Sequence, residues 1–239
     1  MPKTLVAIHQ PNFLPWLGYF DKIARADIFV ILDSVQFAKT GGTWSNRVQM
    51  LVGGRAAWLT VPIVRSYHDV RTYREMQFSD AAPWRAKHLK SISLNYAAAP
   101  YFDEMFPLLQ TLLATPTSSL AEFNEVVIRA LCEGLQIETG KLARSSALPV
   151  AGNATDLLIA IVQAVGGTAY LAGGLASTYQ EDEKFAEAGI ELVYQHFQHP
   201  IYPQVNSQEF VPGLSIMDAL MNCGWERTRR LLHASEENG

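Results

Sequence analysis

Continuous apolar runs, short enough to be strands, flank an amphipathic segment at the start of this chain. Residues 5–8 and 28–32 are such runs, as expected for strands buried on both faces of a parallel sheet. Between them, residues 17–26 carry apolar side chains at helical spacing, and Pro15 suits the first helical position, where its missing N–H costs nothing. The pattern predicts a β-α-β unit with a right-handed crossover.

A second unit of this kind lies near the C-terminus. Residues 168–172 and 190–194 are predicted strands, and residues 179–189 are a predicted helix between them. The chain then closes with helices at residues 214–223 and 225–233. The polar tail, residues 234–239, is expected to fray.

The middle of the chain departs from this alternation. Residues 48–52 and 57–64 are predicted to pair as a β-hairpin around Gly53-Gly54. Helices are expected from residue 82 onward and at residues 102–114, 118–134 and 155–165. Pro107 either kinks or ends the second of these helices, and Thr155 is expected to cap the last.

Together these elements predict an α/β protein with a parallel-sheet, Rossmann-like core, a β-hairpin excursion and a helical insert. The length, 239 residues, suits a single domain. Within it, residues 1–80 and 136–233 are expected to form the α/β core, and residues 82–135 the helical insert.

Composition narrows the class of protein. The net charge is −4 and no basic cluster is present, so a nucleic-acid partner is not expected. Cys132 and Cys223 are the only cysteines, which argues against a disulfide framework or a cysteine-based zinc site. No signal peptide is evident, and no apolar run approaches the roughly 20 residues of a membrane span. We therefore expect a cytoplasmic protein acting on a small molecule, while its cofactors and oligomeric state stay open.

Three polar loops follow predicted strands and should meet at one edge of the sheet. The first begins with His9, Gln10 and Asn12, between the first strand and the first helix. Ligands bind at the carboxyl edge of an open α/β sheet. Free N–H groups at the start of a helix favour binding of a phosphate or a carboxylate there. The alternative is a tight turn in which His9 is simply hydrogen-bonded to the backbone.

The second loop, residues 33–47, offers side chains of several kinds. Asp33 can reach a ligand hydroxyl, a metal or His9, or it is a turn residue. Lys39 and Arg47 can pair with phosphate, or they are solvated cations. Trp44 can stack on a base or sugar, or it belongs to the core. Two amides in this loop are further candidates for substrate binding, Gln36 and Asn46.

The third loop starts with Gly173 and Gly174, which permit close approach of backbone to a ligand or form a plain turn. A proline-rich segment further on carries three more candidate pocket residues, His199, Tyr202 and Gln204, unless it is an irregular surface crossing. On the following helix, Asp218 and Asn222 share a face. If they are buried, they need hydrogen-bond partners, for which the His199 segment is a candidate.

Several familiar catalytic motifs are absent: the P-loop, the G-x-S-x-G elbow and H-E-x-x-H. His196 and His199 are three residues apart but have no obvious third ligand, so no metal site is predicted.

Several segments together resemble the WbqC-like protein family. Residues 7–20 (AIHQPNFLPWLGYF) are similar to its opening signature. The later matching segments keep the family's order: residues 33–37, 44–47, 58–62, 199–204 and 214–218. One departure is Ala172, where the family pattern has a Ser before the glycines.

The resemblance implies a bacterial protein linked to surface-polysaccharide (O-antigen, lipopolysaccharide) synthesis. It implies a transferase that attaches an acyl or aminoacyl group to the amine of a nucleotide-linked amino sugar. A looser similarity of layout, to the H-x-G-H nucleotidyl-transfer enzymes, keeps ATP-dependent adenylyl transfer as an alternative, although the second His is missing here. Because no complete catalytic motif is present, a non-catalytic module that binds a nucleotide sugar is a second alternative.

For the transferase hypothesis, His9 is the expected general base, because its ordinary pKa lies near the working pH. Asp33 would orient His9 or hold a hydroxyl, and Lys39 and Arg47 would bind pyrophosphate. We expect the candidates of the first two loops to converge on one cleft, with residues 199–204 as its far wall.

Overall fold

The computed structural model describes residues 2–38, 43–79, 81–173 and 181–233. Its centre is a five-stranded sheet in the order β5-β2-β1-β6-β7, in which every neighbouring pair is parallel. The strands are β1 (Leu5–His9), β2 (Ile28–Ile31), β5 (Leu142–Arg144), β6 (Ala169–Ala172) and β7 (Glu191–Tyr194). The predicted α/β class with a parallel core is confirmed.

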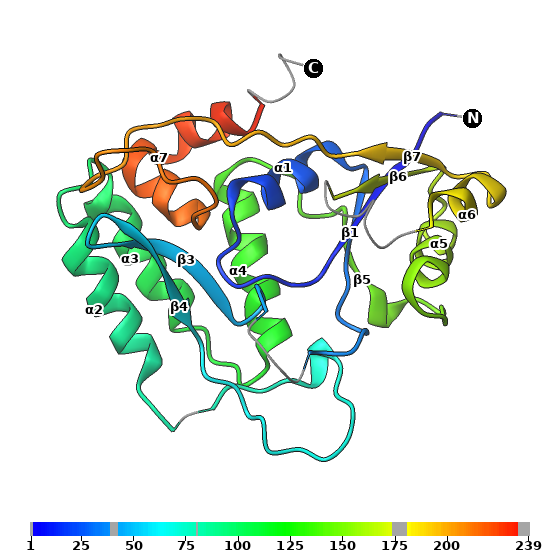
Figure 1. Ribbon diagram of the computed structural model, residues 1–239, viewed down its shortest axis with the longest axis horizontal. Helices are drawn as coiled ribbons and strands as arrows, with labels where there is room; N and C mark the ends of the chain where they lie inside the picture. The colour runs from blue at the N-terminus through cyan, green and yellow to red at the C-terminus, as the bar shows by residue number, and fades with distance from the viewer. Residues whose placement is uncertain (1, 39–42, 80, 174–180, 234–239) are drawn as a thin grey trace.

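Helices cover both faces of this sheet (Figure 1). One face packs on α1 (Leu17–Arg25), α4 (Leu120–Gly134) and α7 (Ile216–His233), and the other on α5 (Ala154–Ala164) and α6 (Asp182–Glu187). Alternation along β1 divides the two cores, because Ala7 faces the first and Val6 and Ile8 face the second. This three-layer arrangement is Rossmann-like.

The hairpin excursion is formed by β3 (Arg47–Val52) and β4 (Arg55–Thr60), which pair antiparallel. Gly53 and Gly54 make its turn with φ of 60° and 75°, a backbone region that favours glycine. Helices α2 (Trp84–Tyr96) and α3 (Phe102–Leu113) lie beside the hairpin, at the end of the molecule opposite α5 and α6 (Figure 1). Hairpin, α2, α3 and sheet share one hydrophobic core, and the assignment of residues 82–135 to an insert within a single domain stays a prediction.

Element boundaries correct two sequence expectations, for Pro15 and Thr155, and decide one alternative, for Pro107. Pro15 precedes α1 rather than starting it, because Trp16 is the N-cap and forms a bridge with Ser215. Pro107 lies inside α3 and does not end it. The N-cap of α5 is Asn153, not Thr155, whose hydroxyl instead accepts a hydrogen bond from the loop before α6.

Other differences arise from length. Strand β5 was not predicted, since three residues are too few to show a period. The two expected C-terminal helices form α7, broken at Gly224, where φ is 67°. Short 3₁₀ turns lie at Tyr73–Glu75 and Ser145–Ala147.

The expected start of the helix at residues 179–180 and the tail 234–239 lie outside the described residues. Among the described helices, none combines the length and apolarity needed to cross a membrane.

Candidate functional site

The turn after β1, residues 10–16, is held in place by elements far along the chain. The Nδ2 amide of Asn124, on α4, donates to the carbonyl of Pro11 at 2.9 Å. The hydroxyl of Ser215, just before α7, donates to the carbonyl of Leu14 at 2.8 Å. Leu14 has a φ of 43°, a conformation that these contacts stabilise. These contacts fix the turn, which begins at Gln10, directly after His9.

Two adjoining cavities open at this turn, one of about 290 Å³ and one of about 550 Å³. We call them the smaller and the larger cavity. Four residues line both: His9, Gln10, Lys22 and Gly173. The smaller cavity is otherwise mostly apolar, with a wall that includes Ile8, Leu32, Val35, Leu157, Leu158 and Tyr170. The wall of the larger cavity includes Asn12, Trp16, Trp44, Gln195, Phe197 and His199.

The sheet topology explains this location. From β1 the chain moves to β2 on one side, and later returns to β6 on the other side of β1. In doubly wound sheets, loops leave the carboxyl ends of two such strands in opposite directions and open a crevice between them. His9 ends β1 and Gly173 directly follows β6, so both cavities lie in that crevice.

His9 is a neutral ring at neutral pH. Burial lowers its pKa to about 4, with a further contribution from the charge of Lys22. Its Nδ1 lies 3.1 Å from the carbonyl of Gln10. Because a carbonyl can only accept, this contact assigns the proton to Nδ1 and leaves the lone pair on Nε2. The hydrogen bond to backbone that the sequence left as an alternative is thus present, and His9 still lines both cavities.

Lys22 is a site residue that the sequence analysis missed. It lies on α1, is 3% exposed, and donates from Nζ to the carbonyl of Ile8 at 3.1 Å. Burial lowers its pKa to about 7. Its place in an amphipathic helix gave no sign of this, because a lysine there is usually a solvated residue.

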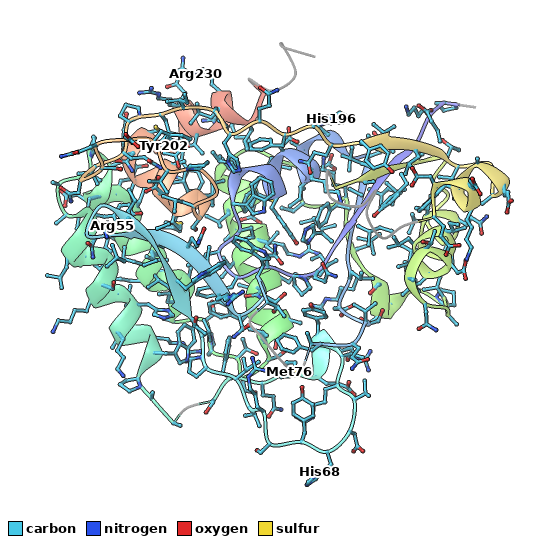
Figure 2. The ribbon with its side chains drawn as sticks, in the orientation of Figure 1. Arg55, His68, Met76, His196, Tyr202 and Arg230 are labelled. Atoms are coloured by element: carbon cyan, nitrogen blue, oxygen red, sulfur yellow. The ribbon has the colours of Figure 1, made fainter. Side chains whose placement is uncertain are left out.

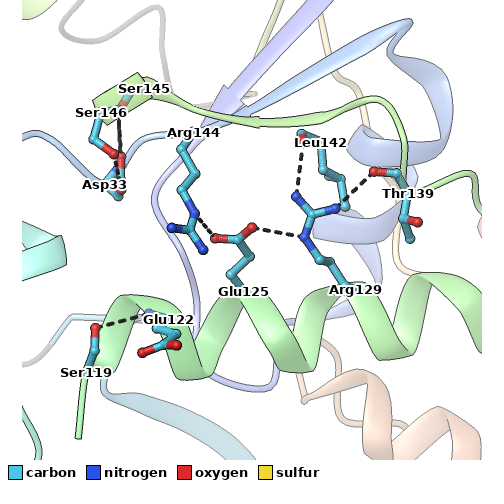
Figure 3. Close-up of polar contacts among 10 residues, drawn as sticks. All are labelled: Asp33, Ser119, Glu122, Glu125, Arg129, Thr139, Leu142, Arg144, Ser145 and Ser146. Atoms are coloured by element: carbon cyan, nitrogen blue, oxygen red, sulfur yellow. Dashed lines mark hydrogen bonds and ion pairs between the residues drawn. The ribbon is translucent and has the colours of Figure 1, made fainter. Parts of the chain in front are cut away.

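Asp33 does not share the cavities of His9, which corrects the expected convergence of these two residues. Its carboxylate accepts hydrogen bonds from Ser145 Oγ at 3.0 Å and from the N–H and Oγ of Ser146 at 2.9 and 2.7 Å (Figure 3). It opens into a separate cavity of about 380 Å³, whose wall also contains Arg144, paired with the buried Glu125. The 3₁₀ turn after β5, which the sequence did not reveal, draws the carboxylate away from His9.

The structure places the other candidates of the second loop as follows. Gln36 is exposed and lines none of the cavities described above. Asn46 is buried and donates from Nδ2 to the carbonyl of Val61 at 3.1 Å, a structural contact. The guanidinium of Arg47 lies over the ring of Trp58, 4.2 Å from its centroid.

Among the described candidate residues of this loop, Trp44 reaches the site. It lines the larger cavity, is 42% exposed, and meets Trp58 edge-on at 5.0 Å. Lys39 and Gly174 lie outside the described residues.

The proline-rich segment divides between two places. His199 lines the larger cavity and lies against Trp16, with ring centroids 5.1 Å apart. Tyr202 and Gln204 instead donate to Oδ2 of Asp218, at 2.7 and 2.9 Å. Figure 2 shows Tyr202 beside α7. Only His199 therefore contributes to the expected far wall.

Asp218 and Asn222 obtain the partners that the sequence predicted. Besides Tyr202 and Gln204 on Asp218, the N–H of Val205 donates to Oδ1 of Asn222 at 2.8 Å. Both residues are buried, so these contacts dock the segment that follows β7 onto α7.

Comparison with known proteins agrees with the resemblance seen in the sequence. Residues 10–230 match the WbqC-like protein family. The chain belongs to this family. It is 32% identical over 223 residues to a protein of Mycobacterium tuberculosis (strain H37Rv) named Uncharacterized protein Rv1507c, a match that covers 92% of this chain and 94% of the mycobacterial protein. No solved structure matches this WbqC-like chain.

The departure at Ala172 lies just outside the cavities. Ala172 is fully buried in the core beneath α5 and α6, and it is the next residue, Gly173, that lines both cavities. A methyl group in place of a hydroxymethyl group at position 172 is therefore a change of core packing.

Proposed function

We propose that this WbqC-like protein transfers an acyl or aminoacyl group to the amine of a nucleotide-linked amino sugar, in the synthesis of bacterial surface polysaccharide such as O-antigen. The observation that carries the proposal is the pair of cavities at the switch point of the sheet, with His9 in the wall of both. Family membership supports the polysaccharide context.

The size and lining of the larger cavity suit such an acceptor. Its volume, about 550 Å³, lies within the range of roughly 300–1,000 Å³ common for small-molecule sites. Trp44 offers a half-exposed ring for stacking on a base or a sugar. Asn12 and Gln195 supply polar groups that can orient hydroxyls.

His9 would act as the proton acceptor through Nε2. A ring with a pKa of about 4 is too weak a base to deprotonate a free sugar ammonium. After a neutral amine attacks the acyl carbon, however, the nitrogen in the tetrahedral adduct is far more acidic. His9 then takes the proton from that nitrogen, and collapse of the adduct expels the group that carried the acyl chain.

Replacement of His9 tests this role. We expect His9→Asn to lower turnover by roughly 10²-fold or more while leaving the unfolding transition in place. Turnover is followed by mass spectrometry of nucleotide-linked amino sugars mixed with candidate acyl donors, with and without ATP. His68→Asn is the matched control, because His68 is exposed and lies far from α1 (Figure 2). Full activity of His9→Asn would exclude His9 as the base.

The same panel separates the alternatives. Binding of a nucleotide sugar by calorimetry, with no change of mass in any mixture, would favour a non-catalytic binding module. Release of AMP or pyrophosphate from ATP would favour an adenylyl-transfer enzyme.

A further inference from the structure

Lys22 is a buried amine whose charge no carboxylate among the described residues balances, although the ring centroid of Tyr170 lies 5.8 Å from its Nζ. Its Nζ is buried, and its one hydrogen bond among the described residues is to the carbonyl of Ile8. No described carboxylate lies within ion-pair distance of it. The neighbouring Asp21 accepts from Gln195 at 2.6 Å and lies 3.7 Å from Arg25.

The walls of both cavities show the same imbalance. Among the described residues, the lining contains no Asp or Glu, and Lys22 is its only Lys or Arg. The other titratable groups there are His9 from β1, Tyr19 from α1, Tyr170 from β6 and His199 from the segment after β7. Burial lowers the pKa of both histidines and raises that of Tyr19, so these three groups are uncharged near neutral pH.

We propose that Lys22 binds the anionic part of the ligand, the pyrophosphate of a nucleotide-linked sugar, and that a proton is taken up as the complex forms. The identity of the anion rests on the proposed function. The geometry favours Lys22 over Arg47, because Arg47 lies on Trp58 and outside both cavities. A buried ammonium gains most from an anion in this setting, because water does not screen the pair.

The affinity for the anion should decrease as the pH rises. Burial lowers the pKa of free Lys22 to about 7, and a bound anion would raise it again. Below that pH the lysine is already charged, so affinity stays level. Above it, each binding event must take a proton from solvent, and affinity falls by up to about tenfold per pH unit until the pKa of the complex is reached.

Calorimetry in buffers of different ionisation enthalpy measures this proton. Suitable probes are UDP-N-acetylglucosamine and dTDP-glucose, because their pyrophosphate diesters keep the same charge between pH 6 and 8.5. We expect uptake close to zero at pH 6 and approaching one proton at pH 8.5. Free His9 is neutral across this range, because its pKa of about 4 lies below it.

Three variants sharpen the test. Lys22→Arg should bind the probes without proton uptake, because arginine stays charged. Lys22→Met should bind at least about tenfold more weakly at pH 6. Lys141→Met is the control. Lys141 is part-buried and donates to the carbonyls of Ala24 and Ala26, but it lines neither cavity, so binding should not change.

Each outcome decides the proposal. Absence of proton uptake by the wild type, wild-type affinity in Lys22→Met, or no binding of either probe at millimolar concentration would overturn it. If Lys22→Met does not fold, the wild type and Lys22→Arg still give the answer. Proton-linked binding without acyl transfer would refute the proposed function alone, and His9-dependent transfer with no Lys22 effect would refute this inference alone.

Discussion

At the scale of single residues, the larger cavity depends on close approach between Trp16 and Gly18. A Cβ added at Gly18 would lie 2.1 Å from Cζ3 of Trp16. The ring of Trp16 also packs against Phe197 and His199, at centroid distances of 5.4 and 5.1 Å, so its displacement would disturb these contacts as well. Glycine is required here for space, since its backbone is helical.

Gly18→Ala should therefore displace the ring of Trp16 and weaken ligand binding. Helix propensity alone would favour alanine by about 1 kcal/mol, so any loss of affinity reflects the clash. Tryptophan fluorescence and calorimetry with UDP-N-acetylglucosamine measure the two effects. Gly140→Ala is the control, because its added Cβ would come no closer than 3.4 Å, to Glu138 Oε1. Unchanged fluorescence and affinity in Gly18→Ala would contradict this account.

Also at this scale, residue type predicted cavity-lining residues only where a polar, aromatic or glycine residue directly follows a predicted strand or lies in one of the loops after it. His9, Gln10, Asn12, Trp44, Gly173 and His199 line the cavities as the sequence led us to expect. Lys22 was missed, because desolvation of an amine depends on what packs around it and has no local sequence pattern.

At the scale of elements, α4 connects the turn after β1, residues 10–16, with the second loop, residues 33–47. The Nδ2 amide of Asn124 donates to Pro11 at 2.9 Å and to the carbonyl of Ser45 at 2.8 Å, and Asn124 is fully buried. One side chain thus satisfies a backbone carbonyl in each of two loops that lie 34 residues apart in the sequence.

Loss of this amide should be costly. We expect Asn124→Ala to lower the free energy of unfolding by about 2 kcal/mol or more, because two buried carbonyls lose their donor. Chemical denaturation gives the value. Asn95→Ala, on α2, is the control: its contact with the N–H of Gly53 is solvent-exposed, so we expect a smaller loss. Equal losses in the two variants would show that the Asn124 contacts carry no special weight.

Most strands and helices were predicted correctly from the sequence. The strands β1, β2, β6 and β7, the hairpin and the helices α1 to α4 follow from apolar periodicity and from glycine and proline positions. The capping of α5 and the three-residue β5 did not, because caps and short strands depend on partners elsewhere in the chain.

At the scale of the whole molecule, Asp218 joins three regions. Its carboxylate accepts from Tyr96 on α2 at 2.7 Å and from Tyr202 and Gln204 in the segment after β7. Burial raises the pKa of this carboxyl, and the three donors oppose that shift. Because the same segment carries His199 to the larger cavity, the network also positions the cavity wall.

Tyr202→Phe removes one donor and keeps the ring. We expect the free energy of unfolding to fall by about 1.5–3 kcal/mol, the usual contribution of a hydrogen bond to a charged group. Tyr101→Phe, at a site 41% exposed, should change it little. A calorimetric or denaturant comparison of the two decides the matter, and a neutral Tyr202→Phe would mean that the network does not stabilise the fold.

The sequence alone determined the fold class, the family and the edge of the sheet where the candidate site lies. Apolar periods, turn residues and polar residues after strands are local signals, and parallel strands bring their carboxyl ends together whatever their order. Only the tertiary structure decided which polar side chains share a cavity. It separated Asp33, Tyr202 and Gln204 from His9 and brought in Lys22. The reason is that cavities, burial and hydrogen-bond partners arise from contacts between elements far apart in the chain.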